Sequence, residues 1–182
     1  MIFGIFRRRD DSSIRSVYEQ IVAQARQPYF YTDLQVPDTV EGRFEMIVLH
    51  AFLVFHRLRN QGKEAQDFSQ GVFDLFFQDM DQSMREMGIG DEGVRRRIRA
   101  MTESFYGRSS SYAEGLSSGN RSILAQSLLK NIYGGAQEVI AADRLVDYMQ
   151  HSLDVLGELS EDEIRKGRVA FAAPDTLAGK KQ

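Results

Sequence analysis

The sequence predicts an all-α protein, built as a single-domain bundle of about six to seven helices. Apolar residues recur at intervals of three and four along most of the chain, as they do on one face of a helix. No segment shows the sustained alternation of apolar and polar residues, bounded by hairpin turns, that is typical of strands. A length of 182 residues suits one domain with a sizeable core.

The helical bundle is expected to occupy most of the chain. We assign residues 1–11 to a flexible N-terminal arm, residues 12–170 to the helical domain and residues 171–182 to a mobile C-terminal tail. The longest apolar stretch, Met46 to Phe55, has ten residues and is interrupted by His50. A membrane-spanning helix needs roughly 20 apolar residues, so we expect no membrane span.

The first two long helices should flank a short connection. The first is expected to begin after one of residues 11–13, an Asp-Ser-Ser sequence whose side chains suit an N-cap. Pro28 and Pro37 bracket the connection that follows. The second should run from about Thr39 to Asn60 and lie at the centre of the fold, because much of it is apolar all round.

The next two helices each carry an apolar stripe. The third should span Glu64 to Met87, and Asp91 is a candidate cap for the fourth. The stripe of the third contains Phe68, Val72, Phe76, Met80, Met84 and Met87, and that of the fourth contains Val94, Ile98, Met101 and Phe105.

Three further helices are expected in the C-terminal third. The fifth should run from Arg121 to Tyr133 and end at two glycines. Ser160 and Glu163 have the spacing of a capping box, which predicts a short seventh helix. The sixth helix carries the seam Val139, Ala142, Val146, Met149, Leu153 and Leu156, with the spacing of residues that pack on a neighbouring helix.

The composition is that of a globular protein and excludes several classes. A net charge of -3 excludes a globally basic nucleic-acid binder. Without cysteine, the chain has no disulfide, no thiolate metal site and no thiol catalysis. At the N-terminus a short apolar stretch precedes the arginines, which reverses the order of a signal peptide, so we expect no cleaved signal.

No catalytic or metal-binding constellation is evident. The spacing of His50, His56 and His151 does not place two of them on one helical face as metal ligands. Asp79 and Asp81 lack the further ligand and the glycine of an EF-hand loop. We therefore expect no catalytic residues, no metal site, no cofactor and no enzymatic activity.

Arginines are concentrated at the start of the fourth helix, in the sequence V-R-R-R-I-R. Arg95 and Arg99 share a helix face with Tyr106, and Arg96 lies beside them. Such a face suits contact with the phosphates of RNA or of anionic lipid. The alternative interpretation is a solvated face held by a pair between Arg99 and Glu103.

The N-terminal arm combines apolar and basic residues. One interpretation is a peg at a membrane interface, with apolar side chains in the lipid and arginines at the headgroups. The alternative is a disordered terminus. The apolar residues are Ile2, Phe3, Ile5 and Phe6, and the arginines are Arg7, Arg8 and Arg9.

Short motifs follow one another in a specific order between Val17 and Leu116. They are I-V-A-Q-A-R, P-x-F-Y, V-P-D-T-x-E-G-R-F-E-M-I-V-L-H, F-x-D-M-D, R-E-M-G-I-G-D and F-Y-G-R. In this order and spacing the chain resembles the ubiquinol-cytochrome c chaperone family, the assembly factors of the cytochrome bc complex. The sequence from Arg95 to Arg97 is more uniformly basic than is usual in that family.

The resemblance implies a non-enzymatic assembly chaperone that binds cytochrome b early, near the ribosome and the membrane, for biogenesis of ubiquinol-cytochrome c reductase. No mitochondrial presequence is evident, which implies a bacterial member, cytoplasmic and peripheral at the inner membrane. Further partners would be the ribosome and an anionic membrane surface, and the need for a small helper subunit is left open.

The resemblance also singles out candidate binding residues. Polar residues at motif positions would recognise loops or helix ends of the client, and an exposed apolar groove would hold its apolar segment. The candidates for client binding are Arg43, Asp79, Asp81, Arg85, Glu86, Tyr106 and Arg108. The candidates for phosphate or headgroup contact are Arg7, Arg8, Arg9, Arg95, Arg96 and Arg99.

Two other functions compete with this interpretation. A helical ribosome- or RNA-binding module would use the Arg95–Arg99 face, and its affinity would fall steeply with salt. An enzyme acting on isoprenoid or lipid substrates would house its chemistry between the helices, but the spaced acidic motifs of such enzymes are missing.

Overall fold

The computed structural model describes residues 11–135 and 139–175. Within these ranges it contains eight helices and no strand, which confirms the predicted all-α class. Two helices are short, α2 (Pro28–Thr32) and α8 (Glu161–Arg165). The longer ones are α1 (Asp11–Ala25), α3 (Val40–Leu58), α4 (Lys63–Glu86), α5 (Asp91–Ser117), α6 (Arg121–Ile132) and α7 (Val139–Gly157).

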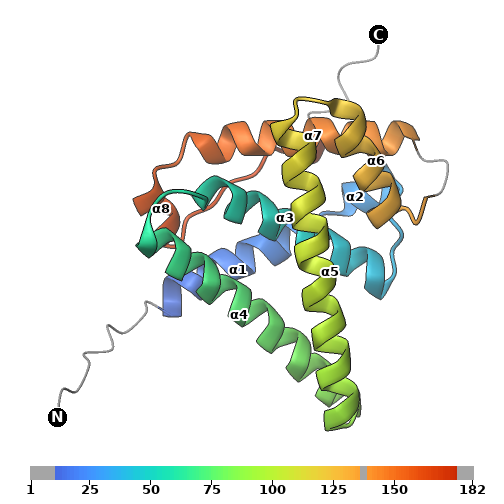
Figure 1. The fold of residues 1–182 in the computed structure, drawn as a ribbon, viewed down its shortest axis with the longest axis vertical. Coiled ribbons are helices and arrows are strands. Elements are labelled where there is room, and N and C mark those ends of the chain that lie inside the picture. The colour runs from blue at the N-terminus through green and yellow to red at the C-terminus, as the bar shows by residue number, and fades with distance from the viewer. Residues whose placement is uncertain (1–10, 136–138, 176–182) are drawn as a thin grey trace.

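Helix α3 lies at the centre and contacts α1, α4, α5, α6 and α7 (Figure 1). Helices α4 and α5 meet at the lower end of the molecule in Figure 1 and diverge toward α3, while α7 crosses the top. Among the described helices, none combines the length and the apolar content needed to cross a bilayer.

The central position of α3 follows from its sequence. Its middle is buried all round, including Met46, Leu49 and Leu53, which are fully shielded from solvent. The Thr39 hydroxyl caps the helix by accepting a hydrogen bond from the Gly42 backbone N–H at 3.1 Å. A Cβ atom at Gly42 would lie 1.9 Å from the Pro37 carbonyl oxygen, so only glycine fits this turn.

Several local predictions differ from the structure. Residue Gly90 occupies the N-cap position of α5, and Asp91 is the first helical residue. The connection after Pro28 contains the short helix α2, because proline is favourable in a first helical turn. Met87, expected in the apolar stripe of the third helix, is 68% exposed because the chain turns away from the core there.

The C-terminal segment is held against the core. The predicted capping box of Ser160 and Glu163 is present at the start of α8. Farther on, the ring of Phe171 packs edge-on against the His50 ring, and the Ala172 N–H donates to the Ser152 hydroxyl at 3.2 Å. Phe171 and Ala172 fall in the range assigned to the tail. Residues 1–10 of the predicted arm and residues 176–182 of the tail lie outside the described part of the chain.

A buried histidine joins three parts of the fold. The His50 Nδ1–H donates to the Met46 carbonyl oxygen at 2.7 Å, since a carbonyl only accepts, and Nε2 therefore accepts from the Tyr148 hydroxyl at 2.7 Å. The Gln24 side chain donates to the same hydroxyl at 2.9 Å. Burial without a charged partner lowers the pKa of His50 to about 4, so the imidazole is neutral at physiological pH.

Protonation of His50 is expected to destabilise the fold in acid. Between pH 6.5 and pH 4 the unfolded chain binds a proton that the folded protein excludes, so the free energy of unfolding falls as pH falls, by about 3 kcal/mol over that window. Denaturant unfolding at several pH values measures this effect. His50→Gln should flatten the pH dependence, whereas His151→Gln, at an exposed site, should not. A pH dependence that is unchanged in His50→Gln would contradict the assignment.

Candidate functional site

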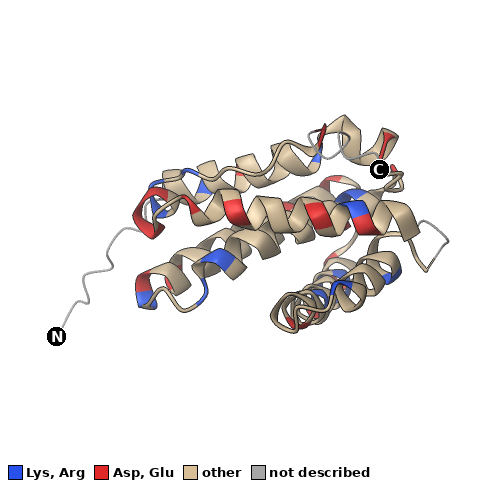
Figure 2. Cartoon of the chain, turned by 90° about the horizontal axis from the view of Figure 1, so that it is seen from above, with Lys and Arg blue, Asp and Glu red and all other residues tan. Residues whose placement is uncertain are grey.

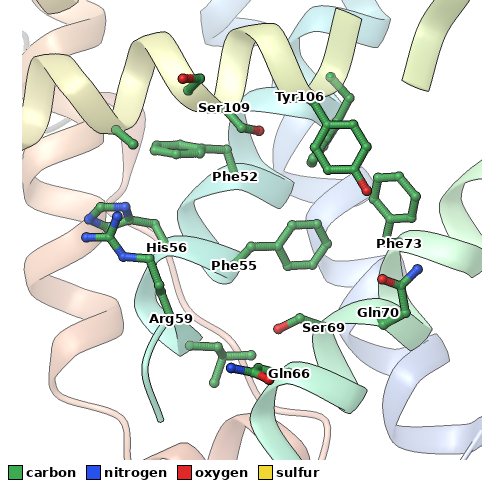
Figure 3. Close-up of a pocket in the computed structure, with 14 residues that line it drawn as sticks. Phe52, Phe55, His56, Arg59, Gln66, Ser69, Gln70, Phe73, Tyr106 and Ser109 are labelled. Carbon is green, nitrogen blue, oxygen red and sulfur yellow. The ribbon is translucent and has the colours of Figure 1, made fainter. Parts of the chain in front are cut away.

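An apolar groove lies between the diverging halves of α4 and α5, with α3 as its floor (Figure 3). Its volume is about 510 Å³, and it is open to solvent. This volume falls in the range of small-molecule and cofactor pockets, roughly 300 to 1,000 Å³. The lining residues are Phe52, Phe55, His56, Leu58 and Arg59 from α3 and its end, Gln66, Ser69, Gln70 and Phe73 from α4, and Phe105, Tyr106, Ser109, Ser110 and Ala113 from α5.

Aromatic packing determines where the groove closes. The Phe73 ring of α4 lies 5.2 Å from the Phe105 ring and 5.7 Å from the Tyr106 ring of α5, measured between centroids. Below this contact the two helices pack directly on each other, and the Phe77 ring lies 6.3 Å from the Phe105 ring, measured between centroids. Above it they separate, and the aromatic side chains of α3 face the opening.

The two ends of the groove differ chemically. Phe73 and Tyr106 lie at one end, and His56 and Arg59 lie at the other, with Phe55 between them (Figure 3). Tyr106 is 57% exposed, so its ring is accessible to a partner in the groove. Burial, and then the positive charge of Arg59, lower the pKa of His56, so its imidazole is neutral at physiological pH.

The junction between α4 and α5 contains three of the predicted site residues. The Arg85 guanidinium pairs with the Asp81 carboxylate, Nε to Oδ1 2.5 Å, and with Asp91 across the turn. Glu86 is exposed and accepts a hydrogen bond from the Gln82 amide at 2.8 Å. The four-residue spacing of Asp81 and Arg85 already favoured a surface ion pair between them, and the structure adds the contact of Arg85 with Asp91, which braces the junction.

Two other predicted residues also have partners within the chain. Arg43 pairs with Asp38 just before α3, Nε to Oδ1 2.7 Å, and both side chains are exposed. The Tyr18 hydroxyl of α1 donates to the Asp79 carboxylate of α4 at 2.7 Å. Neither Arg43 nor Asp79 lines the groove. Of the seven client-binding candidates, Tyr106 alone is among the groove's lining residues.

Arg108 is paired with a buried carboxylate of α3. Its Nε donates to the Glu45 carboxylate of α3 at 2.5 Å, and the two side chains are 21% and 8% exposed. Burial raises the pKa of Glu45, and the hydrogen bond from Arg108 opposes that shift. The pair links α5 to α3, so we expect its loss to lower the free energy of unfolding.

The basic residues at the start of α5 are exposed. Arg99 pairs with Glu103, Nε to Oε1 3.0 Å, as the solvated-face interpretation predicted, and Arg95 lies 3.8 Å from Glu92. For Arg96 the described residues supply no ion pair. Figure 2 shows basic and acidic residues interspersed over the helices in view. Arg7, Arg8 and Arg9 lie outside the described residues.

Sequence reasoning missed most of the groove. Phe55, His56, Arg59 and Phe73 were not among the predicted site residues, although the expectation of an apolar groove agrees with the structure. The sequence contained one signal for them, because the polar residues His56 and Arg59 follow directly on the apolar centre of α3. The divergence of α4 and α5, which opens the groove, has no local sequence signature.

Comparison with known proteins identifies similar chains. The family model described as ubiquinol-cytochrome C chaperone matches residues 32–171. In the crystal structure of the Cbp3 homolog from Brucella abortus, the chain is 38% identical and superimposes with a TM-score of 0.84, covering 96% of this chain and 98% of that one.

Eukaryotic relatives are more distant and longer. Protein CBP3, mitochondrial, of Saccharomyces cerevisiae is 26% identical over 162 residues, which cover 86% of this chain and 48% of the yeast protein. Ubiquinol-cytochrome-c reductase complex assembly factor 1 of Xenopus laevis is 27% identical over 144 residues, covering 78% of this chain and 72% of that protein. The chain thus spans about half the length of the yeast relative and of the mouse and human ones.

Proposed function

The chain belongs to the ubiquinol-cytochrome c chaperone family, and from this premise we propose that it is a non-enzymatic assembly chaperone that binds cytochrome b during biogenesis of ubiquinol-cytochrome c reductase. Relatives named as assembly factors of that complex support this role. We place its site of action in the cytoplasm of a bacterium, at the inner membrane. The ribosome, an anionic membrane surface and a small helper subunit are further proposed partners.

The observation that carries the proposal is the groove between α3, α4 and α5. A newly made membrane subunit exposes apolar helices that must be shielded from water, and burial of apolar surface contributes about 25 cal/mol per Å². The groove is lined by half-buried Phe55 and Phe73 and by exposed Tyr106, which suits a helix laid into it. Its rim of serine and glutamine side chains suits the polar edge of such an interface.

The proposed client site comprises the groove together with the charged candidates outside it. Five of these candidates are exposed or half-exposed, and the Arg108 side chain is 21% exposed. We propose that they contact loops or helix ends of cytochrome b: Arg43, Asp79, Asp81, Arg85, Glu86 and Arg108. Such rim contacts set orientation and association rate more than affinity.

A photocrosslinking experiment tests the proposed site. With a benzophenone amino acid in place of Tyr106, irradiation of cells is expected to couple the protein to cytochrome b, because position 106 is exposed and lines the groove. The same amino acid in place of Lys130, exposed on α6 and outside the groove, should give little product. Detection uses antibody to cytochrome b. Equal yields from both positions, or no cytochrome b product from position 106, would count against the groove.

A second candidate function rests on the arginines of α5. Arg95, Arg96 and Arg99 are exposed on α5, and among the described residues Arg96 has no ion-pair partner that would explain it. A ribosome- or RNA-binding module would use this face. Binding of ribosomal RNA that weakens steeply with salt, and that is lost in Arg96→Glu, would favour this function over the chaperone. Salt-independent association would reject it.

A further inference from the structure

The lining of the groove contains cationic and neutral polar groups but no carboxylate, and this asymmetry indicates the chemistry of its occupant. Of the 14 lining residues none is Asp or Glu, while Arg59 and His56 lie together at one end (Figure 3). The inference below rests on the proposed function and specifies which kind of client segment the groove takes.

Arg59 forms no ion pair with any of the described residues. It is exposed, and the described part of the chain places no carboxylate within ion-pair distance of its guanidinium. The end of α3 is already held by Arg57, which donates to the carbonyl oxygens of Leu156 at 3.1 Å and Leu159 at 2.6 Å. Arg59 is therefore available to a partner, and a guanidinium suits a carboxylate, which it binds through two parallel hydrogen bonds.

His56 and Ser109 add unused hydrogen-bonding groups to the groove. The His56 ring lies 5.3 Å from the Phe52 ring, and within the described residues neither ring nitrogen has a hydrogen-bond partner. The Ser109 hydroxyl is buried and also lacks a partner there. Buried or half-buried polar groups are rarely left unpaired, so a partner that supplies an acceptor beside His56 would satisfy the N–H of its ring.

The shape of the site selects a helix. Two diverging helices form walls over the floor of α3, and aromatic rings of all three elements line the trough between them. An amphipathic or apolar helix fits such a trough because the apolar side chains on one of its faces pack against the groove, as in helix-in-groove recognition. The end with Phe73 and Tyr106 offers two aromatic rings with the Gln70 amide beside them and no charged side chain among the lining residues, which suits apolar side chains.

We infer that the occupant of the groove is an apolar helical segment of the client that carries a carboxylate side chain at the end beside Arg59 and His56. The apolar part of the segment packs on Phe55, Phe73 and Tyr106 and supplies most of the affinity. The carboxylate pairs with Arg59, accepts a hydrogen bond from the neutral His56 imidazole, and thereby fixes the direction in which the segment lies.

Synthetic peptides test this inference with the full chain. Apolar helical peptides that end in Glu, Gln or Lys, each with a soluble polymer tail at the other end, are titrated with the protein, and fluorescence anisotropy gives the affinity. The Glu peptide is expected to bind about fivefold more tightly than the Gln peptide, the effect of one partly exposed ion pair, and the Lys peptide more weakly still. In Arg59→Glu the order should reverse in favour of Lys, whereas Arg15→Glu, exposed on α1, should keep the wild-type order.

Three outcomes of the peptide titrations would contradict the inference. Equal affinity for the three peptides overturns the carboxylate inference, and so does an order that Arg59→Glu leaves unchanged. Binding of laurate without binding of any peptide overturns the helical occupant and identifies the groove as a site for small amphiphilic anions. The proposed function is judged separately, by the cellular level of cytochrome b in a strain that lacks the protein.

Discussion

Replacing Ser110 by tryptophan is expected to weaken capture of cytochrome b at least about tenfold, a loss of about 1.4 kcal/mol of binding free energy. Ser110 is exposed and lines the groove on α5, so an indole at this position occupies space that the client segment would fill. The side chain points away from the packed core, and the variant should therefore keep the stability of the wild type. Co-purification of cytochrome b with the tagged protein measures the effect.

Ser117→Trp is the matched control for this variant. Ser117 is exposed near the end of the same helix and does not line the groove, so the same substitution there should leave capture unchanged. If both variants capture cytochrome b as well as the wild type, the groove is not the client site. If both lose capture equally, the effect does not come from the groove.

Replacing Arg108 by alanine is expected to destabilise the fold by about 2 to 3 kcal/mol at neutral pH. The change leaves the Glu45 carboxylate buried without its cation, and breaking a buried ion pair costs about 3 to 5 kcal/mol, a range reduced here because Arg108 is 21% exposed. The loss should shrink as pH falls, because protonation removes the unpaired charge. Burial already raises the pKa of Glu45, so this relief begins above the usual carboxyl range.

Thermal and denaturant unfolding measure this effect, with Arg99→Ala as the control. Arg99 forms an exposed pair with Glu103 on the same helix, so its loss should not change stability measurably. Equal stability of Arg108→Ala and wild type would show that the pair with Glu45 contributes nothing. Reduced client capture without reduced stability would instead favour direct contact of Arg108 with the client.

The fold was largely predictable because its helices are specified locally. Apolar spacing and punctuation by proline and glycine placed the long helices within a few residues of their observed ends, and Ser160 with Glu163 marked α8 through a capping box. The prediction of the N-cap of α5 was wrong because contacts beyond the local sequence determine which residue caps the helix. Asp91 is a residue type favoured at the N-cap, yet its carboxylate pairs with Arg85 across the turn and Gly90 takes the cap position.

The candidate site was less predictable because it depends on long-range geometry. Tyr106 was singled out from its motif, and it lines the groove, but Arg108 in the same motif turns inward to Glu45. A polar residue at a motif position can therefore stabilise the fold or line a binding site, and the sequence alone does not distinguish the two roles. Phe55 and Phe73 became site residues only because α4 and α5 diverge above their aromatic contact.

The measurement that tests the central claim most directly is the amount of cytochrome b and the ubiquinol-cytochrome c reductase activity in membranes of a strain that lacks this protein. A respiratory enzyme without cytochrome b serves as the control, and the wild-type gene, Ser110→Trp and Ser117→Trp are returned to the strain. We predict a selective loss of cytochrome b and of reductase activity, restored by the wild type and by Ser117→Trp but not by Ser110→Trp. Normal levels of both in the deletion strain would contradict the chaperone function.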